Sequence, residues 1–159
     1  MNAIVVADRS WAIGRDGGLL FSLPTDMKRF RSLTMGGAVI LGRKTLATFP
    51  GGRPLKNRRN LILSRNPHFQ AEGAEVFPSV EELVKQADGD AFVIGGASVY
   101  EQLLPYCDTA YITKIHAGFP ADTHFPNLDQ SEEWKVTEES ESLEQDGISY
   151  HYVTYSRIK

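Results

Sequence analysis

The sequence is poor in the residues that hold small proteins together covalently or through metals. Cys107 is its only cysteine, which excludes a disulfide framework, and its four histidines show no spacing typical of a metal site. No run of about 18 apolar residues occurs, and the N-terminus lacks the basic and apolar regions of a secretory signal. We therefore expect a cytoplasmic protein with no structural metal, disulfide or membrane span.

The composition is that of an ordinary globular domain. Hydrophobic residues make up 42% and charged residues 23% of the chain, which excludes disordered and collagen-like proteins. A length of 159 residues suits one domain over residues 1–159 and leaves no room for two full-sized domains.

Negative charge is absent from the segment Met27–Ala71, which holds ten basic and no acidic residues. Residues 1–26 carry a net charge of −1 and residues 72–159 carry −12, so the overall charge of −3 hides a strong asymmetry. Two interpretations remain open. The basic segment binds an anionic ligand or partner, or it is a solvated face that acidic neighbours balance in space.

Short apolar runs alternate with helical patterns along most of the chain. Such runs predict strands buried on both faces, and the alternation predicts an α/β sandwich with a largely parallel sheet. The predicted strands are Ala3–Ala7, Ala38–Leu41, Leu61–Leu63, Ala91–Ile94 and Ala110–Ile115. The predicted helices are Pro24–Met35, a helix capped by Ser79 that ends near Ala87, and Ala97–Leu104.

The last thirty residues have a different pattern. Glu133–Ser140 and Ile148–Arg157 are strand-like, and a turn signal at residues 145–147 lies between them. We expect an antiparallel hairpin at one edge of the sheet. Near the other end of the chain, the glycine-rich stretch Asp8–Ser22 is long for a loop in a small domain, which is typical of a functional lid.

Two basic motifs follow predicted strands. Gly42-Arg43-Lys44-Thr45 offers a glycine, two cations and a hydroxyl at a strand end, and Ser64-Arg65 follows the next strand in the equivalent place. Ligands of open α/β sheets bind outside these carboxyl ends, so the motifs point to several phosphates on one ligand. Exposed basic turns remain the alternative.

Gly95-Gly96 lies between a predicted strand and a predicted helix. A glycine pair permits close approach of a pyrophosphate to the backbone, although the pattern is not the GxGxxG fingerprint of the common dinucleotide fold. A tight strand-to-helix turn is the alternative interpretation.

Asp26 shares one face of the first predicted helix with Phe30 and Leu33, at i, i+4 and i+7. One interpretation is a partly desolvated carboxylate with a raised pKa that handles protons or pairs with a cationic heterocycle. The other is an acidic residue that complements the helix dipole. Arg58 could clamp a carboxylate bidentately or remain solvated.

Taken in order along the chain, these motifs resemble those of dihydrofolate reductases. Each is weak alone, but together they cover essentially the whole sequence. The residues that carry the resemblance are Ile13-Gly14, Leu23-Pro24-Thr25-Asp26 with Phe30, Gly42–Thr45, Arg58, Leu63-Ser64-Arg65, Val93–Tyr100 and Asp122-Thr123-His124-Phe125-Pro126.

The resemblance implies a three-layer sandwich whose mostly parallel eight-stranded sheet ends in the antiparallel hairpin. It implies one cleft for NADPH and dihydrofolate, with residues 38–88 forming the adenosine-binding part. Hydride would pass from the nicotinamide to the pterin to give tetrahydrofolate. The resemblance further implies a monomer that binds antifolates, with no nucleic-acid or membrane partner.

For the substrate, the resemblance implies that Asp26 binds the pyrimidine edge of the pterin and assists its protonation, and that Thr113 bonds Asp26. Arg58 would bind the glutamate α-carboxylate. The remaining substrate residues would be Ile4, Val5, Leu19, Met27, Phe30, Phe49, Leu55 and Ile94.

For the cofactor, the resemblance implies phosphate contacts at the basic strand ends and nicotinamide contacts near Gly95. The implied residues are Val6, Ile13, Gly14, Gly42, Arg43, Lys44, Thr45, Leu63, Ser64, Arg65, Ile94, Gly95, Gly96, Ala97, Ser98, Val99, Tyr100 and Thr123.

Two departures from the family pattern stand out. Leu20-Phe21 replaces the usual Pro-Trp, so Phe21, at a catalytic position, cannot donate the hydrogen bond that helps hold a water near the carboxylate. Phe119-Pro120-Ala121 replaces a loop that often carries glycine, which should stiffen it. Two other functions remain as alternatives: a pyrimidine-type reductase of riboflavin synthesis, and a non-catalytic nucleotide- or nucleic-acid-binding module that uses the basic segment.

Overall fold

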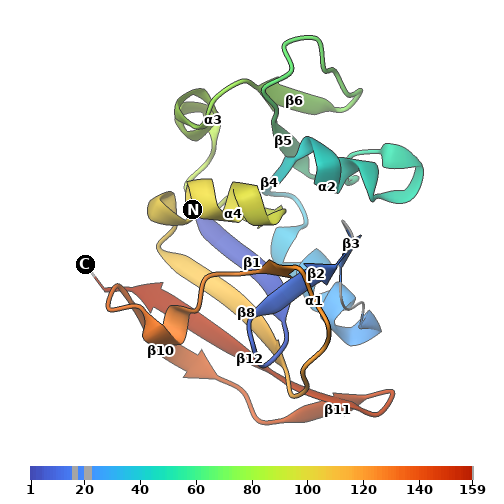
Figure 1. The fold of residues 1–159 in the computed structure, drawn as a ribbon. Coiled ribbons are helices and arrows are strands. Elements are labelled where there is room, and N and C mark those ends of the chain that lie inside the picture. Colours follow the sequence, from blue (N-terminus) through green and yellow to red (C-terminus); the bar gives the residue numbers. More distant parts are fainter. Residues whose placement is uncertain (16–17, 20–22, 159) are drawn as a thin grey trace.

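The computed structural model describes residues 1–15, 18–19 and 23–158. Its largest sheet contains β1 (Asn2–Ala7), β4 (Ala38–Gly42), β5 (Arg59–Leu63), β6 (Ala74–Phe77), β7 (Phe92–Gly95), β8 (Thr109–Ile115), β10 (Trp134–Glu139), β11 (Leu143–Gln145) and β12 (Ile148–Arg157). The strand order is β10-β12-β8-β1-β7-β4-β5-β6, with β11 paired to β12 (Figure 1). The predicted strands are all present, with ends shifted by one or two residues.

The helices begin where the sequence signals place them. They are α1 (Pro24–Thr34), α2 (Arg43–Ala47), α3 (Val80–Gln86) and α4 (Ala97–Leu103), with 3-10 turns at Pro50–Gly52, Leu104–Tyr106 and Leu128–Gln130. Proline occupies the first turn of α1, and the Ser79 side chain caps α3 by accepting from the Glu82 backbone N–H at 3.2 Å. Within the described residues, no helix is long and apolar enough to cross a membrane.

The helices cover both faces of the large sheet. Leu83 of α3 and Leu103 of α4 pack into one core cluster, whereas Leu46 of α2 joins a separate cluster. Neighbouring strand residues divide between the clusters, Ile40 with the first and Leu41 with the second. Because successive side chains of a strand point to opposite faces, the two clusters lie on opposite sides of the sheet. The predicted three-layer α/β sandwich is confirmed (Figure 1).

The central strands are parallel and the C-terminal strands antiparallel, as predicted. β1 runs parallel to β7 and β8, and β4, β5 and β6 run parallel to one another, whereas β12 is antiparallel to both β8 and β10. The hairpin differs in detail. The tight turn at Asp146 and Gly147, both with positive φ, joins β12 to the extra strand β11, and β10 pairs farther along β12.

A small antiparallel sheet lies beside the large one and was not predicted. It consists of β2 (Ala12–Arg15), β3 (Gly18–Leu19) and β9 (Thr123–His124), in the order β3-β2-β9. Strands of two to four residues are too short for an alternating pattern to appear. Residues 16–17 and 20–22 lie outside the described part of the chain, so the lid predicted over Asp8–Ser22 stays a prediction.

The large sheet separates between β1 and β7. These strands pair only at Asn2 with Phe92 and Ala3 with Val93, whereas β1 pairs with β8 as far as Ala7. The Ile4 carbonyl beyond the last pair accepts a hydrogen bond from the Tyr100 hydroxyl of α4 at 2.7 Å. In open α/β sheets ligands bind at such crevices outside the carboxyl ends of the strands.

Candidate active site

Asp26 and Thr113 form a buried polar pair beside this crevice. Asp26 lies in the first turn of α1 and is 9% exposed, and Thr113 lies on β8 and is 2% exposed. The Thr113 hydroxyl donates to Asp26 Oδ1 at 2.6 Å. Since the residues are 87 positions apart, the packing of α1 on the sheet creates this contact.

Burial raises the pKa of the Asp26 carboxyl above its usual value, and the hydrogen bond from Thr113 and the charge of Arg29 oppose this only in part. A carboxyl of this kind takes up a proton more readily than an exposed aspartate. The apolar helix face therefore carries a desolvated carboxyl, as the sequence interpretation requires. A group with these properties in a crevice is suited to general acid–base chemistry.

The predicted apolar site residues lie on both faces of the sheet, since Val5 belongs to the first core cluster and Ile94 to the second. Ile4 and Val5 of β1 are buried, Phe30 of α1 is half-buried, and Ile94 of β7 packs on the same cluster as Phe49 and Leu55. Met27 differs, since half of its side chain is exposed and it is not part of the buried face. The Leu19 side chain and all of Phe21 lie outside the described residues.

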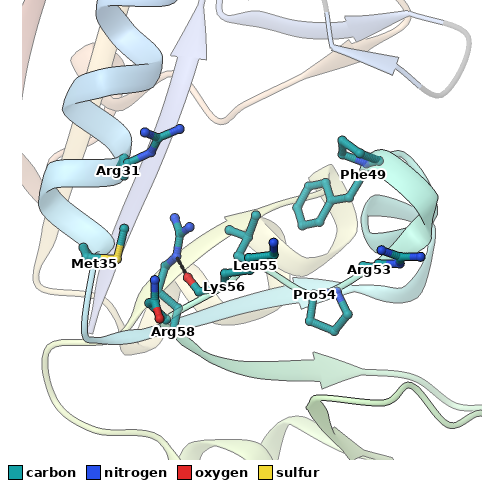
Figure 2. A pocket seen from close by; sticks show the side chains of 10 residues that line it. Arg31, Met35, Phe49, Arg53, Pro54, Leu55, Lys56 and Arg58 are labelled. Atoms are coloured by element: carbon teal, nitrogen blue, oxygen red, sulfur yellow. Dashed lines mark hydrogen bonds between the residues drawn. The ribbon is translucent and has the colours of Figure 1, made fainter.

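A basic cavity of about 510 Å³ opens beside the C-terminal end of α1 (Figure 2). Three predicted substrate residues, Phe49, Leu55 and Arg58, help to line it. The full lining is Arg31, Met35, Phe49, Pro50, Arg53, Pro54, Leu55, Lys56, Asn57 and Arg58. Four cations and no acid surround an otherwise largely apolar space, which suits a ligand with an aromatic body and a carboxylate.

Arg58 is held in place on one side of this cavity. Its Nε donates to the Lys56 carbonyl at 2.9 Å, and its Nη1 donates to the Thr34 hydroxyl at 3.2 Å. Burial and the neighbouring charge of Arg31 lower the pKa of the Arg58 guanidinium, because both disfavour a positive charge there. Within the described residues no acidic side chain pairs with Arg58, so an anion of a ligand would relieve this repulsion.

Asn60 fixes the loop that carries Arg58, and no sequence pattern marked this role. Its side chain is 1% exposed, accepts from the Leu55 N–H at 3.0 Å, and donates to the carbonyls of Leu55 and Arg58 at 2.9 Å each. An asparagine at a strand start is indistinguishable by pattern from a turn residue. Asn60 therefore positions two predicted substrate residues at once.

We predict that Asn60→Ala raises the KM of the substrate and destabilises the fold by about 3 kcal/mol, because it leaves buried backbone groups without partners. Chemical unfolding and steady-state kinetics measure the two effects. Asn127→Ala is the control: it removes an exposed cap bond to the Asp129 N–H and should cost about 1 kcal/mol with no change in KM. An unchanged KM in Asn60→Ala would show that the loop holds its shape without this side chain.

The three predicted phosphate motifs end neighbouring strands. Gly42–Thr45 follows β4, Ser64-Arg65 follows β5, and Gly95-Gly96 ends β7, with β4 between the other two strands. A second cavity of about 540 Å³ lies past β5 and β6, and Ser64 helps to line it. The Arg43 guanidinium lies 5.9 Å from the ring centre of Phe69, another lining residue.

The glycines at these strand ends permit close contacts that a side chain would block. A Cβ on Gly96 would lie 3.2 Å from the Thr45 hydroxyl, and Gly95 has a φ of 141°, which L residues rarely adopt. Gly42 has a packing reason as well, because its Cβ would lie 3.0 Å from Cγ2 of Val99. The backbone of Gly95 and Gly96 thus carries no side chain and lies next to the Thr45 hydroxyl. A pyrophosphate could therefore approach this backbone closely.

The other predicted cofactor residues lie on β1, the small sheet, β5 and α4. Gly14 pairs with Thr123 between β2 and β9, so these two distant motifs do meet. Val99 and Tyr100 are buried in the core. The positions are Val6 on β1, Ile13 and Gly14 on β2, Leu63 on β5, Thr123 on β9, and Ala97, Ser98, Val99 and Tyr100 on α4.

Asp8 is a further buried residue that sequence reasoning missed. One carboxylate oxygen accepts from the Ser10 and Ala12 backbone N–H groups at 2.8 and 2.9 Å, and the other accepts from the Phe119 N–H at 3.0 Å. It therefore ties the turn after β1 to the loop before β9. Among the described residues, no group of three or more His, Cys, Asp or Glu is placed to hold a metal ion.

Comparison with known proteins decides the family. A family model described as dihydrofolate reductase matches residues 1–157. The chain belongs to the dihydrofolate reductase family. It is 37% identical to a dihydrofolate reductase of Bacillus subtilis over 97% of this chain and 92% of that protein. It is 38% identical to that of Mycobacterium tuberculosis over 93% of this chain and 92% of that protein.

The fold agrees with a solved structure of the same family. Dihydrofolate reductase from Enterococcus faecalis, complexed with NADP(H) and RAB-propyl, superposes with a TM-score of 0.88 at 37% identity and covers 99% of this chain and 96% of that one. The chain is an NADPH-dependent oxidoreductase that reduces dihydrofolate to tetrahydrofolate. The comparisons therefore favour this activity over a riboflavin-pathway reductase or a non-catalytic binding module.

Proposed function

We propose that Asp26 and Thr113 form the proton-handling site of this dihydrofolate reductase and that Arg58 binds the carboxylate of the substrate. The observation that carries the proposal is the 2.6 Å bond between the two buried side chains beside the opening of β1 and β7. Burial raises the pKa of Asp26, so its carboxyl takes up a proton more readily than an exposed aspartate, and Thr113 fixes the orientation of the carboxyl.

The length of α1 matches a substrate with a pterin at one end and a carboxylate at the other. Asp26 lies in its first turn, and Met35, directly after the helix, lines the basic cavity. Nine residues of helix span about 14 Å. A pterin held at Asp26 would thus extend its aromatic tail past Phe49 and Leu55 and place its carboxylate at Arg58. The proposed wall is completed by Ile4, Val5, Leu19, Phe21, Met27, Phe30 and Ile94.

The residues present fit NADPH, which supplies the hydride when bound. Arg43, Lys44 and Thr45 would hold phosphates beside the bare backbone of Gly95 and Gly96, and the second cavity would take the adenosine, so that residues 38–88 form its binding part. Ser64 and Arg65 would hold the 2′-phosphate. The chain's part in the reaction is to align both ligands, exclude water and deliver the proton.

We predict that Arg65→Ala weakens NADPH binding by about tenfold and leaves NADH binding nearly unchanged, because only NADPH carries the 2′-phosphate. Binding titrations with both cofactors, repeated at higher salt, measure the difference, and the NADPH effect should shrink as salt rises. Equal losses for the two cofactors would remove Arg65 from the 2′-phosphate site.

We further propose that the enzyme acts as a cytosolic monomer without a nucleic-acid partner and that it binds antifolates in the dihydrofolate site. Among the described residues, the exposed large hydrophobic residues support a monomer, since they come from separate elements: α1 and the residue after it, a 3-10 turn, a loop, β10 and the C-terminus. They are Met27, Met35, Tyr106, Phe119, Val136 and Ile158. Light scattering at micromolar concentration tests the oligomeric state.

A further inference from the structure

Tyr152 of β12 lies beside the Asp26–Thr113 pair. β12 and β8 are antiparallel, and their register places Tyr152 directly opposite Thr113. Opposed residues of an antiparallel pair point to the same face, with Cβ atoms about 5 Å apart. The Tyr152 side chain therefore lies on the sheet face that α1 covers, next to the hydroxyl that bonds Asp26.

The Tyr152 hydroxyl is buried and makes no hydrogen bond of good geometry to the residues that the structure describes, although the Tyr150 side chain lies close enough to raise its pKa as a weak hydrogen-bond partner. Every other buried side-chain nitrogen or oxygen in this part of the chain makes a hydrogen bond. Leaving such a group unpaired is costly, so buried hydroxyls find a protein group or an ordered water. The hydroxyl thus lacks a well-formed hydrogen bond, and the Asp26 carboxyl lies near enough for its charge to act on the pKa of Tyr152.

Arg29 fixes the Tyr152 ring under α1. Its guanidinium carbon lies 4.0 Å from the centre of that ring, and Arg29 follows Asp26 by three residues, one turn along the same helix. Burial, followed by the charge of Asp26, raises the pKa of Tyr152 to about 12. The phenol therefore keeps its proton at neutral pH and serves as a donor.

We propose that Tyr152 is a positioning residue for Asp26: its hydroxyl donates to one buried water, and that water donates to the Asp26 carboxyl. A single water suits the site because Thr113 already occupies Oδ1 and because a buried water needs two or more polar partners. A donor favours the ionised carboxylate, so Tyr152 limits how far burial raises the pKa of Asp26. The proposal rests on the proton-handling function assigned to Asp26.

The groups that set the charge state of Asp26 come from three elements. Thr113 faces it from β8, Arg29 acts on it from α1, and Tyr152 faces it from β12. Tyr150, on the same face of β12, contacts the Tyr152 ring at 5.7 Å and raises the pKa of Tyr152 further. Of these groups, Tyr152 alone has a buried hydroxyl that makes no hydrogen bond of good geometry in the described chain.

Tyr152→Phe tests the proposal, because it removes the hydroxyl and keeps the ring that Arg29 covers. The measurement is the rate of hydride transfer in single turnovers as a function of pH. We expect the apparent pKa of the profile to rise by about half to one unit, a three- to tenfold change in the proton-dissociation constant, with NADPH affinity unchanged. An unchanged profile overturns the proposal.

Tyr155→Phe is the matched control on the same strand. Its hydroxyl lies on the opposite face and donates to Asp129 at 2.7 Å, so this variant should lose stability and keep the wild-type pH profile. Tyr152→Phe should show the reverse: a shifted profile with little loss of stability. A profile shift of equal size in both variants also overturns the proposal.

Asp26→Asn distinguishes a failure of the role assigned to Tyr152 from a failure of the proton-handling role proposed for Asp26. If the pH-dependent step survives in Asp26→Asn, the role of Asp26 itself is wrong. If the step disappears in Asp26→Asn and is the same in Tyr152→Phe as in the wild type, Asp26 keeps its role and only the assignment of Tyr152 fails.

Discussion

Asp26→Asn is expected to lower turnover of dihydrofolate at pH 7 by about 10²- to 10³-fold and to leave NADPH binding nearly unchanged. Asparagine keeps the size of the side chain and still accepts the Thr113 hydrogen bond, but it cannot hold and release a proton. Loss of a positioned acid or base costs about 10²- to 10⁴-fold in rate. Steady-state kinetics and a fluorescence titration with NADPH measure the two effects.

The thermal stability of Asp26→Asn shows whether a loss of turnover comes from the missing proton-handling group or from unfolding of the protein. Burial raises the pKa of Asp26, so the folded state favours the protonated form. The stabilisation this gives is present at low pH and is lost as the pH rises through the folded pKa. Asp26→Asn should therefore melt at or above the wild-type temperature at pH 7. A variant that keeps wild-type turnover, or one that loses NADPH binding as well, contradicts the account.

Arg58→Ala is expected to raise the KM for dihydrofolate by about 10²-fold and to change kcat little. The guanidinium is held through Nε by Lys56 and through Nη1 by Thr34, which leaves Nη2 and the second N–H of Nη1 for a carboxylate in the cavity. A charge-assisted hydrogen bond contributes about 1.5–3 kcal/mol. Because the carboxylate is far from the reacting ring, its binding stabilises the bound substrate and the transition state equally.

Arg53→Ala is the matched control for Arg58→Ala. Arg53 lines the same cavity, but its side chain is exposed, so we expect a change in KM of about twofold or less. Arg58→Lys should recover only part of the loss, since an ammonium cannot bind a carboxylate in the two-pronged manner of a guanidinium. Equal effects of Arg53→Ala and Arg58→Ala would show that the cavity attracts the substrate through net charge alone.

The cations of the basic segment Met27–Ala71 lie in different surroundings, which a count of charges along the sequence does not distinguish. Its cations divide between both interpretations that the sequence left open. Arg58 lies without an acidic partner in the described residues beside a cavity, whereas Arg59 bonds Glu75 with Nη2 to Oε1 at 2.8 Å on the exposed face. Of two adjacent arginines, Arg58 thus faces the cavity and Arg59 forms an exposed ion pair, because successive residues at a strand start point in opposite directions.

Local pattern predicted most of the elements and the burial of Asp26. Helix spacing placed Asp26 with Phe30, and sequence motifs marked the strand ends after β4, β5 and β7 that we propose to bind phosphates, because these features depend on near neighbours in the chain. Thr113 as the partner of Asp26 followed only from the resemblance to the family. The structure brings the two together.

Contacts between residues far apart in the sequence could not be predicted, because they depend on which residues of two paired strands lie opposite each other. Tyr100 reaches the Ile4 carbonyl across 96 positions, and Tyr152 comes opposite Thr113 only because β12 pairs with β8 in one particular register. A shift by one residue would turn Tyr152 to the other face. Asn60 and Asp8 bond mainly to backbone groups of loops, and no local pattern marks such bonds.

The pH dependence of hydride transfer in single turnovers, measured for the wild type and for Asp26→Asn, tests the central claim most directly. The wild-type rate should fall as the pH rises through a pKa above the usual range of an aspartate, because the protonated carboxyl is the active form. In Asp26→Asn the rate should be low, and this step in the profile should be absent. A variant that keeps the wild-type rate and the same step would contradict the assignment of Asp26.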